Sequence, residues 1–351
     1  MFRIDNANAT STLPTPLAPG PVTKGYFQSG NPAVGQKATT VDRDWANTQQ
    51  EEIAHVVEAA GITLSKTDNT QLLQALRSLF VTRTKVTANM TIYVNPTSGS
   101  DTTGNGLTPG TAFATIQTAV NVVYTNYDWN GHLCTIQLAD GTYTINVTYG
   151  YLAYFAGLPF GMPQYGLTVQ GNPSLPQNVI LNAVGGNCLV FDAAIVTLSG
   201  VTVTGTGSVW TPTGFQGYGV LTLRGALAVC SNMRGVNCGA AAFRCDTGSV
   251  IVLQGSNNAV SGSGQSLCIS GEAGQIYLLG STLTVTGFNA TQAVFTCDQG
   301  RITADATTFI GSATGSRYAA VNCGVITTAG GGPNYLPGSS AGNAINGGVY
   351  F

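Results

Sequence analysis

The sequence predicts a mainly β protein, built as a stack of short strands (a β-solenoid) that follows a small helical region. Three observations support this class: five stretches repeat one pattern, equivalent turns recur at a regular spacing, and no run within the repeats is long enough for a helix. Asp246 and Asp298 stand at equivalent turns with Gly271 almost midway, so one coil takes about 26 residues. The repeats are 188–200, 219–231, 241–255, 266–280 and 293–306, with a truncated sixth at 319–330.

Each repeat consists of alternating apolar runs separated by turn residues, with Gly, Ser, Thr, Asn and Val at the remaining positions. Such a unit cannot bury its apolar side chains alone. Stacked on the next unit at ~4.8 Å, it shares one continuous core with its neighbours. We expect this solenoid to cover residues 91–331, and residues 332–351 to form a C-terminal tail.

The position just before each turn supports the alignment of the repeats. It holds Phe191, Leu223, Cys245, Cys297 and Cys323. One interpretation is a disulfide or thiol site, and the other is a column of small buried apolar residues. Cys245 and Cys297 should lie two coils apart, which is too far for a disulfide. We therefore predict that Cys245, Cys297 and Cys323 are buried free thiols.

Charge is scarce. The 351-residue chain has a net charge of −2 and only 8% charged residues. All four lysines precede residue 90, and from residue 91 onward there are five arginines and eight acidic residues. This distribution argues against a nucleic-acid-binding protein that uses a basic patch. It also leaves little material for charged catalysis.

Cysteine and histidine patterns indicate no metal site and no cofactor. The eight cysteines form no CxxC motif or Cys/His ligand spacing, and they are too sparse for a disulfide scaffold. The first ten residues lack the pattern of a signal peptide, and no apolar run reaches the ~18 residues of a membrane span. We therefore expect the chain to fold in a reducing cytoplasm.

Residues 1–41 predict an extended arm, because Pro, Gly, Ala and Thr dominate them. Residues 42–90 predict two short helices and a linker. The first helix should begin at Asp42 or Asp44 and end at Gly61. The second should begin with a capping box of Asp68 and Gln71. Their apolar stripes include Trp45, Ile53 and Val56 on the first helix and Leu72 and Leu76 on the second.

Two such helices bury little core alone, so self-association or docking on a larger body is expected. His55, on the first helix, is more simply a packing residue than a ligand.

Residues 91–123 predict a strand, a turn cluster and a helix that covers the first coil, with Phe113, Ile116, Ala119, Val120 and Val123 facing inward. Asp101 and Asn105 lack the full oxygen set of a calcium loop, so a turn is the simpler interpretation. Residues 134–147, with an Asp140-Gly141 turn, and residues 166–182 predict the first coils.

Two aromatic insertions interrupt the neutral solenoid at 149–166 and 205–219. Aromatic side chains among neutral polar neighbours suit sugar faces or a protein interface. The alternative is that they cover the flank of the solenoid or pack between subunits. As receptor-binding candidates we take Trp210, Phe215, Tyr218, Tyr154 and Phe155.

The N-terminal sequence, from FRIDNANATSTLPTP through QLLQALRSLF, resembles the N-terminal region of tail fibre proteins of bacteriophages and prophages. Residues 91–120 resemble the first coil of right-handed parallel β-helices of the pectate-lyase-like superfold, and the last residues resemble the C-termini of such phage proteins. The resemblance implies a homotrimer in the virion. Residues 42–90 would attach it to the phage tail or baseplate, and the β-helix would contact a host surface polysaccharide or protein, without nucleic acid or membrane insertion.

Many phage β-helices cleave polysaccharide, so an enzyme is the alternative to a binding fibre. Glycoside hydrolysis uses two carboxylates about 5–5.5 Å or about 6.5–9.5 Å apart. Asp246, Glu272 and Asp298 follow the same turn in successive coils, with Arg301 close in sequence. Acidic residues at turns are, however, common turn formers. A receptor-binding fibre is the main interpretation, a tailspike depolymerase (glycoside hydrolase or lyase) the second, and a purely structural tail or baseplate component the third.

Overall fold

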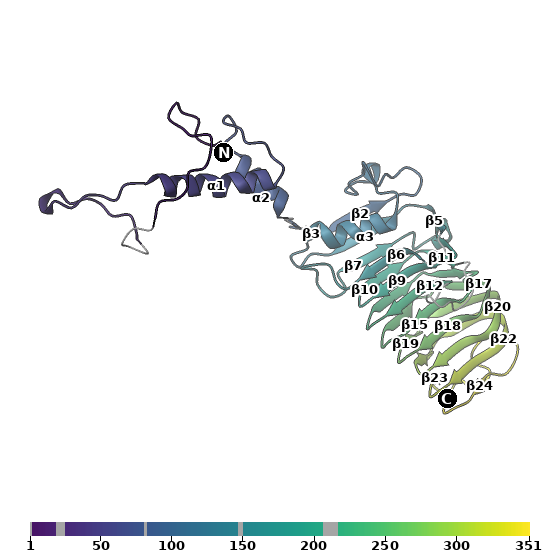
Figure 1. Ribbon diagram of the computed structural model, residues 1–351. Helices are drawn as coiled ribbons and strands as arrows, with labels where there is room; N and C mark the ends of the chain where they lie inside the picture. The colour runs from purple at the N-terminus through teal and green to yellow at the C-terminus, as the bar shows by residue number, and fades with distance from the viewer. Residues whose placement is uncertain (1, 19–24, 81–82, 147–149, 206–216) are drawn as a thin grey trace. The chain divides into compact units, whose positions relative to one another are not determined.

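The computed structural model describes residues 2–18, 25–80, 83–146, 150–205 and 217–351. The chain divides into two compact units, Met1–Thr82 and Arg83–Phe351. Figure 1 shows helices in the first and parallel strands in the second. The units are considered separately below.

The first unit contains helices α1 (Arg43–Ala59) and α2 (Gln71–Leu79) and a short 3-10 turn, η1 (Pro32–Val34). Asp42 caps α1 as predicted, because its side chain accepts a hydrogen bond from the Trp45 amide at 2.7 Å. Gly61 follows the end of the helix in the left-handed region, at φ 73°, which also agrees with the sequence.

The capping box predicted for α2 is wrong. Thr70 occupies the N-cap position without a side-chain cap, and Asp68 instead accepts hydrogen bonds from Thr70. The Gln71 side chain turns toward the connection between the helices, where its amide bonds Thr63 and Ser65. Gln71 therefore fixes the interhelical loop.

The described part of the arm is extended and largely exposed, as predicted. It contacts α1 through Arg3, whose guanidinium pairs with Glu51 at 2.8 Å and with Glu58 at 2.6 Å. These hydrogen bonds lower the pKa of both glutamates. Lys66 pairs with Asp5 at 2.8 Å. The arm is thus anchored within the first unit by ion pairs.

Helix α2 exposes most of its apolar side chains. Gln71 and Ala75 are its buried residues, whereas the leucines of the predicted stripe and the following phenylalanine are 37–63% exposed. The exposed set is Leu72, Leu73, Leu76, Leu79 and Phe80. The predicted amphipathic stripe is therefore present, and its side chains remain exposed in this unit.

The second unit is mainly β, and every pair between its named strands is parallel. Its first sheet contains, in spatial order, β2 (Met90–Val94), β4 (Cys134–Leu138), β7 (Leu167–Gln170), β10 (Ile195–Ser199), β13 (Leu227–Ser231), β16 (Val250–Gln254), β19 (Gln275–Tyr277), β21 (Arg301–Thr303), β23 (Val325–Thr327) and β25 (Val349–Tyr350). The small β1 (Thr84–Lys85) pairs with β3 (Tyr127–Asp128).

The second sheet is folded back on itself through its longest strands. Its spatial order is β5 (Gly141–Asn146), β8 (Val179–Val184), β11 (Thr202–Gly205), β14 (Arg234–Val236), β17 (Asn258–Gly264), β20 (Thr282–Asp298), β18 (Ser266–Gly271), β15 (Ala241–Cys245), β12 (Tyr218–Leu223), β9 (Asn187–Asp192) and β6 (Tyr151–Ala156). One half of β20 pairs with β17 and the other half with β18. β22 (Thr308–Val321) then follows β20 and pairs with β24 (Asn343–Ala344).

The register between strands follows the repeats. Leu227 pairs with Val250, Val250 with Gln275, Gln275 with Arg301, and Arg301 with Val325. Consecutive partners are thus 23, 25, 26 and 24 residues apart. Residues 332–351, expected as a tail, contribute β24 and β25, which extend both sheets (Figure 1).

One continuous apolar core fills the space between the sheets. Alternate residues of each strand point into it, as in β4, where Cys134, Ile136 and Leu138 are buried. Helix α3 (Ile116–Thr125) packs its predicted face into the same core, and Phe113, Ile116, Ala119, Val120 and Val123 are all at most 4% exposed. Asp101 holds the start of α3 by accepting from Ala114 and Thr115, which supports the turn interpretation. Short 3-10 turns, η2 (Pro109–Thr111) and η3 (Pro176–Asn178), complete the early coils.

In six successive coils, one corner turns through a non-glycine residue in the left-handed region. These corners follow β9, β12, β15, β18, β20 and β22, and their residues have φ between 45° and 58°: Ala193, Arg224, Thr247, Glu272, Gln299 and Asn322. The recurrence at the same point of the register means that the turn itself is repeated.

The predicted cysteine column is partly wrong. Its inward-facing members are Phe191, Thr222, Cys245, Ser270, Cys297 and Ala320. Thr222 therefore replaces Leu223, and Ala320 replaces Cys323. Cys245 and Cys297 are buried free thiols separated by Ser270, as expected, but Cys323 is exposed because it lies in the left-handed corner at φ 67°.

Candidate functional site

The candidate site lies on the outer face of the sheet formed by β6, β9, β12, β15, β18 and the second half of β20. One row of paired residues crosses this face, and its side chains alternate with those of the core rows. The row consists of Tyr154, Val190, Leu221, Arg244, Ile269 and Thr296. Val190, Leu221 and Ile269 belong to a small apolar cluster separate from the main core.

At one end of the row, Asp192 is enclosed by Tyr154 and Arg224. The Tyr154 hydroxyl donates to Asp192 Oδ2, and Arg224 Nε donates to Asp192 Oδ1 at 2.6 Å. Asp192 is only 5% exposed. The carboxylate therefore fixes an exposed arginine and a tyrosine from the two neighbouring coils, and the Tyr154 ring packs tilted against Tyr151 at 4.9 Å between ring centroids.

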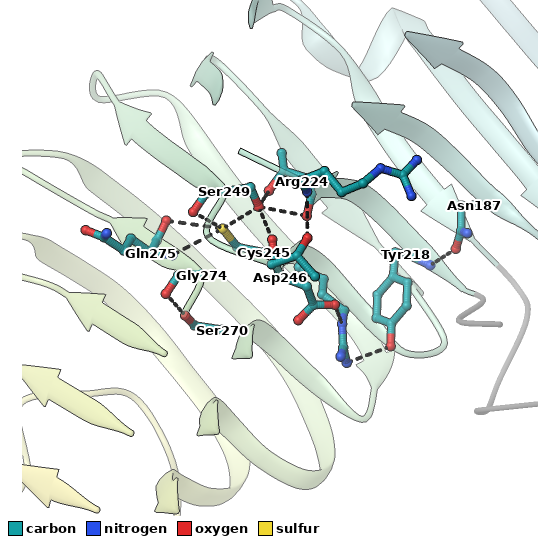
Figure 2. A network of polar contacts seen from close by, with 12 residues as sticks. Asn187, Tyr218, Arg224, Cys245, Asp246, Ser249, Ser270, Gly274 and Gln275 are labelled. Atoms are coloured by element: carbon teal, nitrogen blue, oxygen red, sulfur yellow. Dashed lines mark hydrogen bonds and ion pairs between the residues drawn. The ribbon is translucent and has the colours of Figure 1, made fainter. Parts of the chain in front are cut away.

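Two strands further on, Arg244 links Tyr218 to Asp246. Its Nη1 donates to the Tyr218 hydroxyl at 3.0 Å and its Nε donates to Asp246 Oδ2 at 2.5 Å. The guanidinium also lies over the Tyr218 ring. Figure 2 shows this link in a network that continues through Asn187 on one side and through Cys245, Ser249 and Gln275 on the other.

Asp246 is almost completely buried, with its side chain 1% exposed. Burial raises the pKa of its carboxyl group, and the ion pair with Arg244 opposes that rise. The second oxygen, Oδ1, has no hydrogen-bond partner among the described residues. Asp246 thus holds the Arg244 side chain from below and does not itself reach the surface.

Beside Arg244 lies a pocket of about 430 Å³ that opens between the sheet and the left-handed corners. Its floor is Ile269 and Gly271, and its walls are mainly polar. The lining residues are Tyr218, Arg244, Gln265, Ile269, Gly271, Glu272, Gln292, Thr296, Asp298, Gln299 and Asn322.

The catalytic candidates from the sequence do not meet as one group. Glu272 and Asp298 line the pocket, Asp246 lies buried beneath Arg244, and Arg301 lies on β21 of the other sheet. The register places Gly271 between Asp246 and Asp298, as the repeat spacing predicted. The pocket can therefore offer two carboxylates to a ligand, but Arg301 is not among its lining residues.

The receptor-binding candidates also separate. Tyr154 is half-buried against Asp192, and Tyr218 lines the pocket although it is only 4% exposed. Phe155 is fully buried and packs against Phe191 in the core, so its prediction as a surface contact is wrong. Trp210 and Phe215 lie outside the described residues.

The candidate attachment residues belong to the first unit. Trp45, Leu72 and Leu76 are exposed, whereas Ile53 and Val56 are half-buried on α1. Trp45 meets Phe27 of the arm edge-on at 5.5 Å between ring centroids. Three of the five attachment candidates are therefore exposed in this unit.

Sequence reasoning missed the pocket's amide side chains, Gln265, Gln292, Gln299 and Asn322. Gln265 and Gln292 lie on adjacent chain segments, because the backbone N–H of Gln292 donates to the backbone carbonyl of Gln265 at 3.1 Å. The signal available in the sequence was the concentration of Gln and Asn near turns of adjacent repeats. Periodicity alone did not separate these residues from ordinary surface positions.

Within the described ranges, no group of three or more His, Cys, Asp or Glu side chains is placed to hold a metal ion. No helix in this part of the chain is both long and apolar enough to cross a membrane.

No protein-family model and no solved structure matches this chain. Among curated proteins, it is similar to the uncharacterized protein StfP of Escherichia coli strain K12, with 47% identity over 60 residues. The match covers 17% of this chain and 29% of StfP. The chain therefore spans less than a third of that relative, and the similarity concerns one segment.

Proposed function

We propose that this chain is a tail fibre protein of a bacteriophage or prophage, a virion component that holds the tail through its N-terminal unit and contacts the host through its β stack. One observation supports this proposal above all. The chain combines an N-terminal unit, made of an arm and two helices with exposed apolar side chains, with a second unit made of a long stack of parallel strands. The resemblance of the N-terminal sequence to phage tail fibres and the segment shared with StfP support it.

The finer features of the proposal follow from the same resemblance. The stack is a right-handed β-helix of about 26 residues per coil, and the protein is a homotrimer. An exposed α2 stripe supports self-association or docking onto tail or baseplate proteins, because apolar side chains exposed side by side are typical of interaction surfaces. The partner at the other end is a host surface polysaccharide or protein.

Immunolabelling of purified virions tests the tail role. Antibodies against residues 83–351 should label the tail in electron micrographs of particles from the strain that encodes this chain. Absence of the protein from purified particles that infect normally would contradict the proposal.

A polysaccharide depolymerase is the second candidate. It is favoured by the two carboxylates of the pocket, Glu272 and Asp298, and by the nearby Asp246, whose pKa is raised by burial. Incubation of the protein with host polysaccharide would release reducing ends or unsaturated sugars if this activity is present. If Asp298→Asn and Glu272→Gln leave such a release unchanged, the activity does not reside in this pocket.

A further inference from the structure

The pocket beside Arg244 contains side-chain amides with unused hydrogen-bonding capacity. Within the described residues, the side-chain amides of Gln265, Gln292 and Gln299 have no protein partner, and all three line the same 430 Å³ space, with Gln292 and Gln299 exposed. Each amide offers both donors and an acceptor. Ligands whose groups also donate and accept, such as vicinal hydroxyls, match this arrangement better than groups that only accept.

The charge of the pocket further restricts which ligands it can bind. Arg244 is its one lining cation among the described residues, and its charge is compensated by the buried Asp246 at 2.5 Å. Glu272 and Asp298 form no ion pair in the described part of the chain, and Asp298 accepts only the amide of Asn322, at 3.0 Å. The open surface is therefore negative at neutral pH and disfavours an acidic ligand.

The floor of the pocket depends on a position without a side chain. A Cβ at Gly271 would lie 2.6 Å from Asp246 Oδ1. Glycine therefore allows the buried carboxylate to sit directly below the floor, where it orients Arg244 toward Tyr218. Asp246 is a positioning residue here, because it contacts Arg244 and does not line the pocket.

We propose that this pocket binds a saccharide that carries no acidic group, through the amides of Gln265 and Gln292 and under charge selection by Glu272 and Asp298. The size supports the assignment, since small-ligand sites commonly enclose about 300–1,000 Å³. The inference rests on the proposed function in taking the β stack as the surface that meets the host. It adds the chemical class of the ligand and the location of the site.

A printed array of bacterial saccharides with neutral and acidic members tests the proposal on the full-length protein. Binding should be confined to saccharides without acidic groups. Gln265→Leu and Gln292→Leu should each weaken binding to the best array member by about tenfold, because a bound polar group loses its hydrogen-bond partner. Gln254→Leu is the matched control, because Gln254 is exposed at the end of β16 on the other sheet.

The role of the two carboxylates in discriminating against acidic saccharides is tested by separate variants. Glu272→Gln combined with Asp298→Asn should raise the ratio of binding to acidic members over binding to neutral members. Thermal melting of every variant separates loss of binding from loss of fold. The proposal is overturned if the protein binds only acidic saccharides or none of the array members. It is also overturned if Gln265→Leu and Gln292→Leu leave binding intact. Binding to a host protein in place of a saccharide contradicts it as well.

The tail role is measured independently by immunolabelling. Tail labelling without saccharide binding removes the pocket assignment and keeps the tail fibre role. Saccharide binding by a protein that is absent from tails keeps the pocket assignment and removes the tail fibre role.

Discussion

At the scale of single residues, the left-handed corner makes the strongest conformational demand on the sequence. A non-glycine residue in this region costs roughly 1–2 kcal/mol, because Cβ approaches the following carbonyl oxygen. This strained conformation is adopted, at φ 50° to 58°, by Ala193, Thr247 and Gln299. Neighbouring coils repeat the turn, so the stacked strands on either side hold it in place.

Replacing Ala193 with glycine should raise stability by about 0.5–1 kcal/mol, since relief of the left-handed strain exceeds the entropic cost of glycine. Ala156→Gly is the control, because Ala156 is exposed and lies in strand β6, paired with the residue just before Ala193. It should lower stability by roughly 0.5–1 kcal/mol. Chemical denaturation measures both, and equal effects would contradict the strain argument.

The thiols provide a second test at this scale. Burial raises the pKa of Cys297 to about 11 and that of Cys230 to about 12, whereas Cys323 is exposed. Because the thiolate reacts and a buried thiol is inaccessible, native labelling should modify one cysteine of eight. All eight should react after unfolding. Mass spectrometry identifies the site, and fast native labelling of Cys245 or Cys297 would show that the core is open.

At the scale of elements, periodic segments were predictable and their mutual placement was not. Helix α3 buries the four residues expected of it, and the preceding Phe113 is buried with them, because apolar side chains at helical spacing have one favourable arrangement beside a sheet. By contrast, β17 and β20 shift register between Ser261 and Ser263. Such irregularities place Gln265 beside Gln292, and they cannot be predicted from the spacing of residues in the sequence. The prediction of a capping box for α2 was wrong for a similar reason, because the Gln71 side chain forms hydrogen bonds with the loop between the helices.

The arm contact predicts a dependence on pH. Hydrogen bonds from Arg3 lower the folded pKa of Glu51 and Glu58, so their contribution is present above the unfolded value of about 4.3 and is lost as pH falls through the lowered values. Hydrogen exchange of residues 2–17, corrected for intrinsic rates, should rise below about pH 4. Glu51→Gln with Glu58→Gln should show the same release at pH 7. An arm equally protected in that variant would contradict the assignment.

At the scale of the whole molecule, the chain combines two units with different surface chemistry. The first exposes apolar side chains on α2 and holds most of the ion pairs of the described residues. The second presents few charges and includes the polar pocket beside Arg244, a distribution already visible in the five arginines and eight acidic residues after residue 90. Binding by the β stack should therefore depend weakly on salt, because few charges are available to be screened.

Incorporation into tails tests the central claim most directly. A mutant phage or prophage lacking this gene would be supplied with either the full-length protein or residues 83–351, and purified particles would be probed for it. Circular dichroism first establishes that residues 83–351 keep their β spectrum. We predict that the full-length protein enters the tails and that residues 83–351 do not. Equal incorporation of the two proteins would contradict attachment through the N-terminal unit.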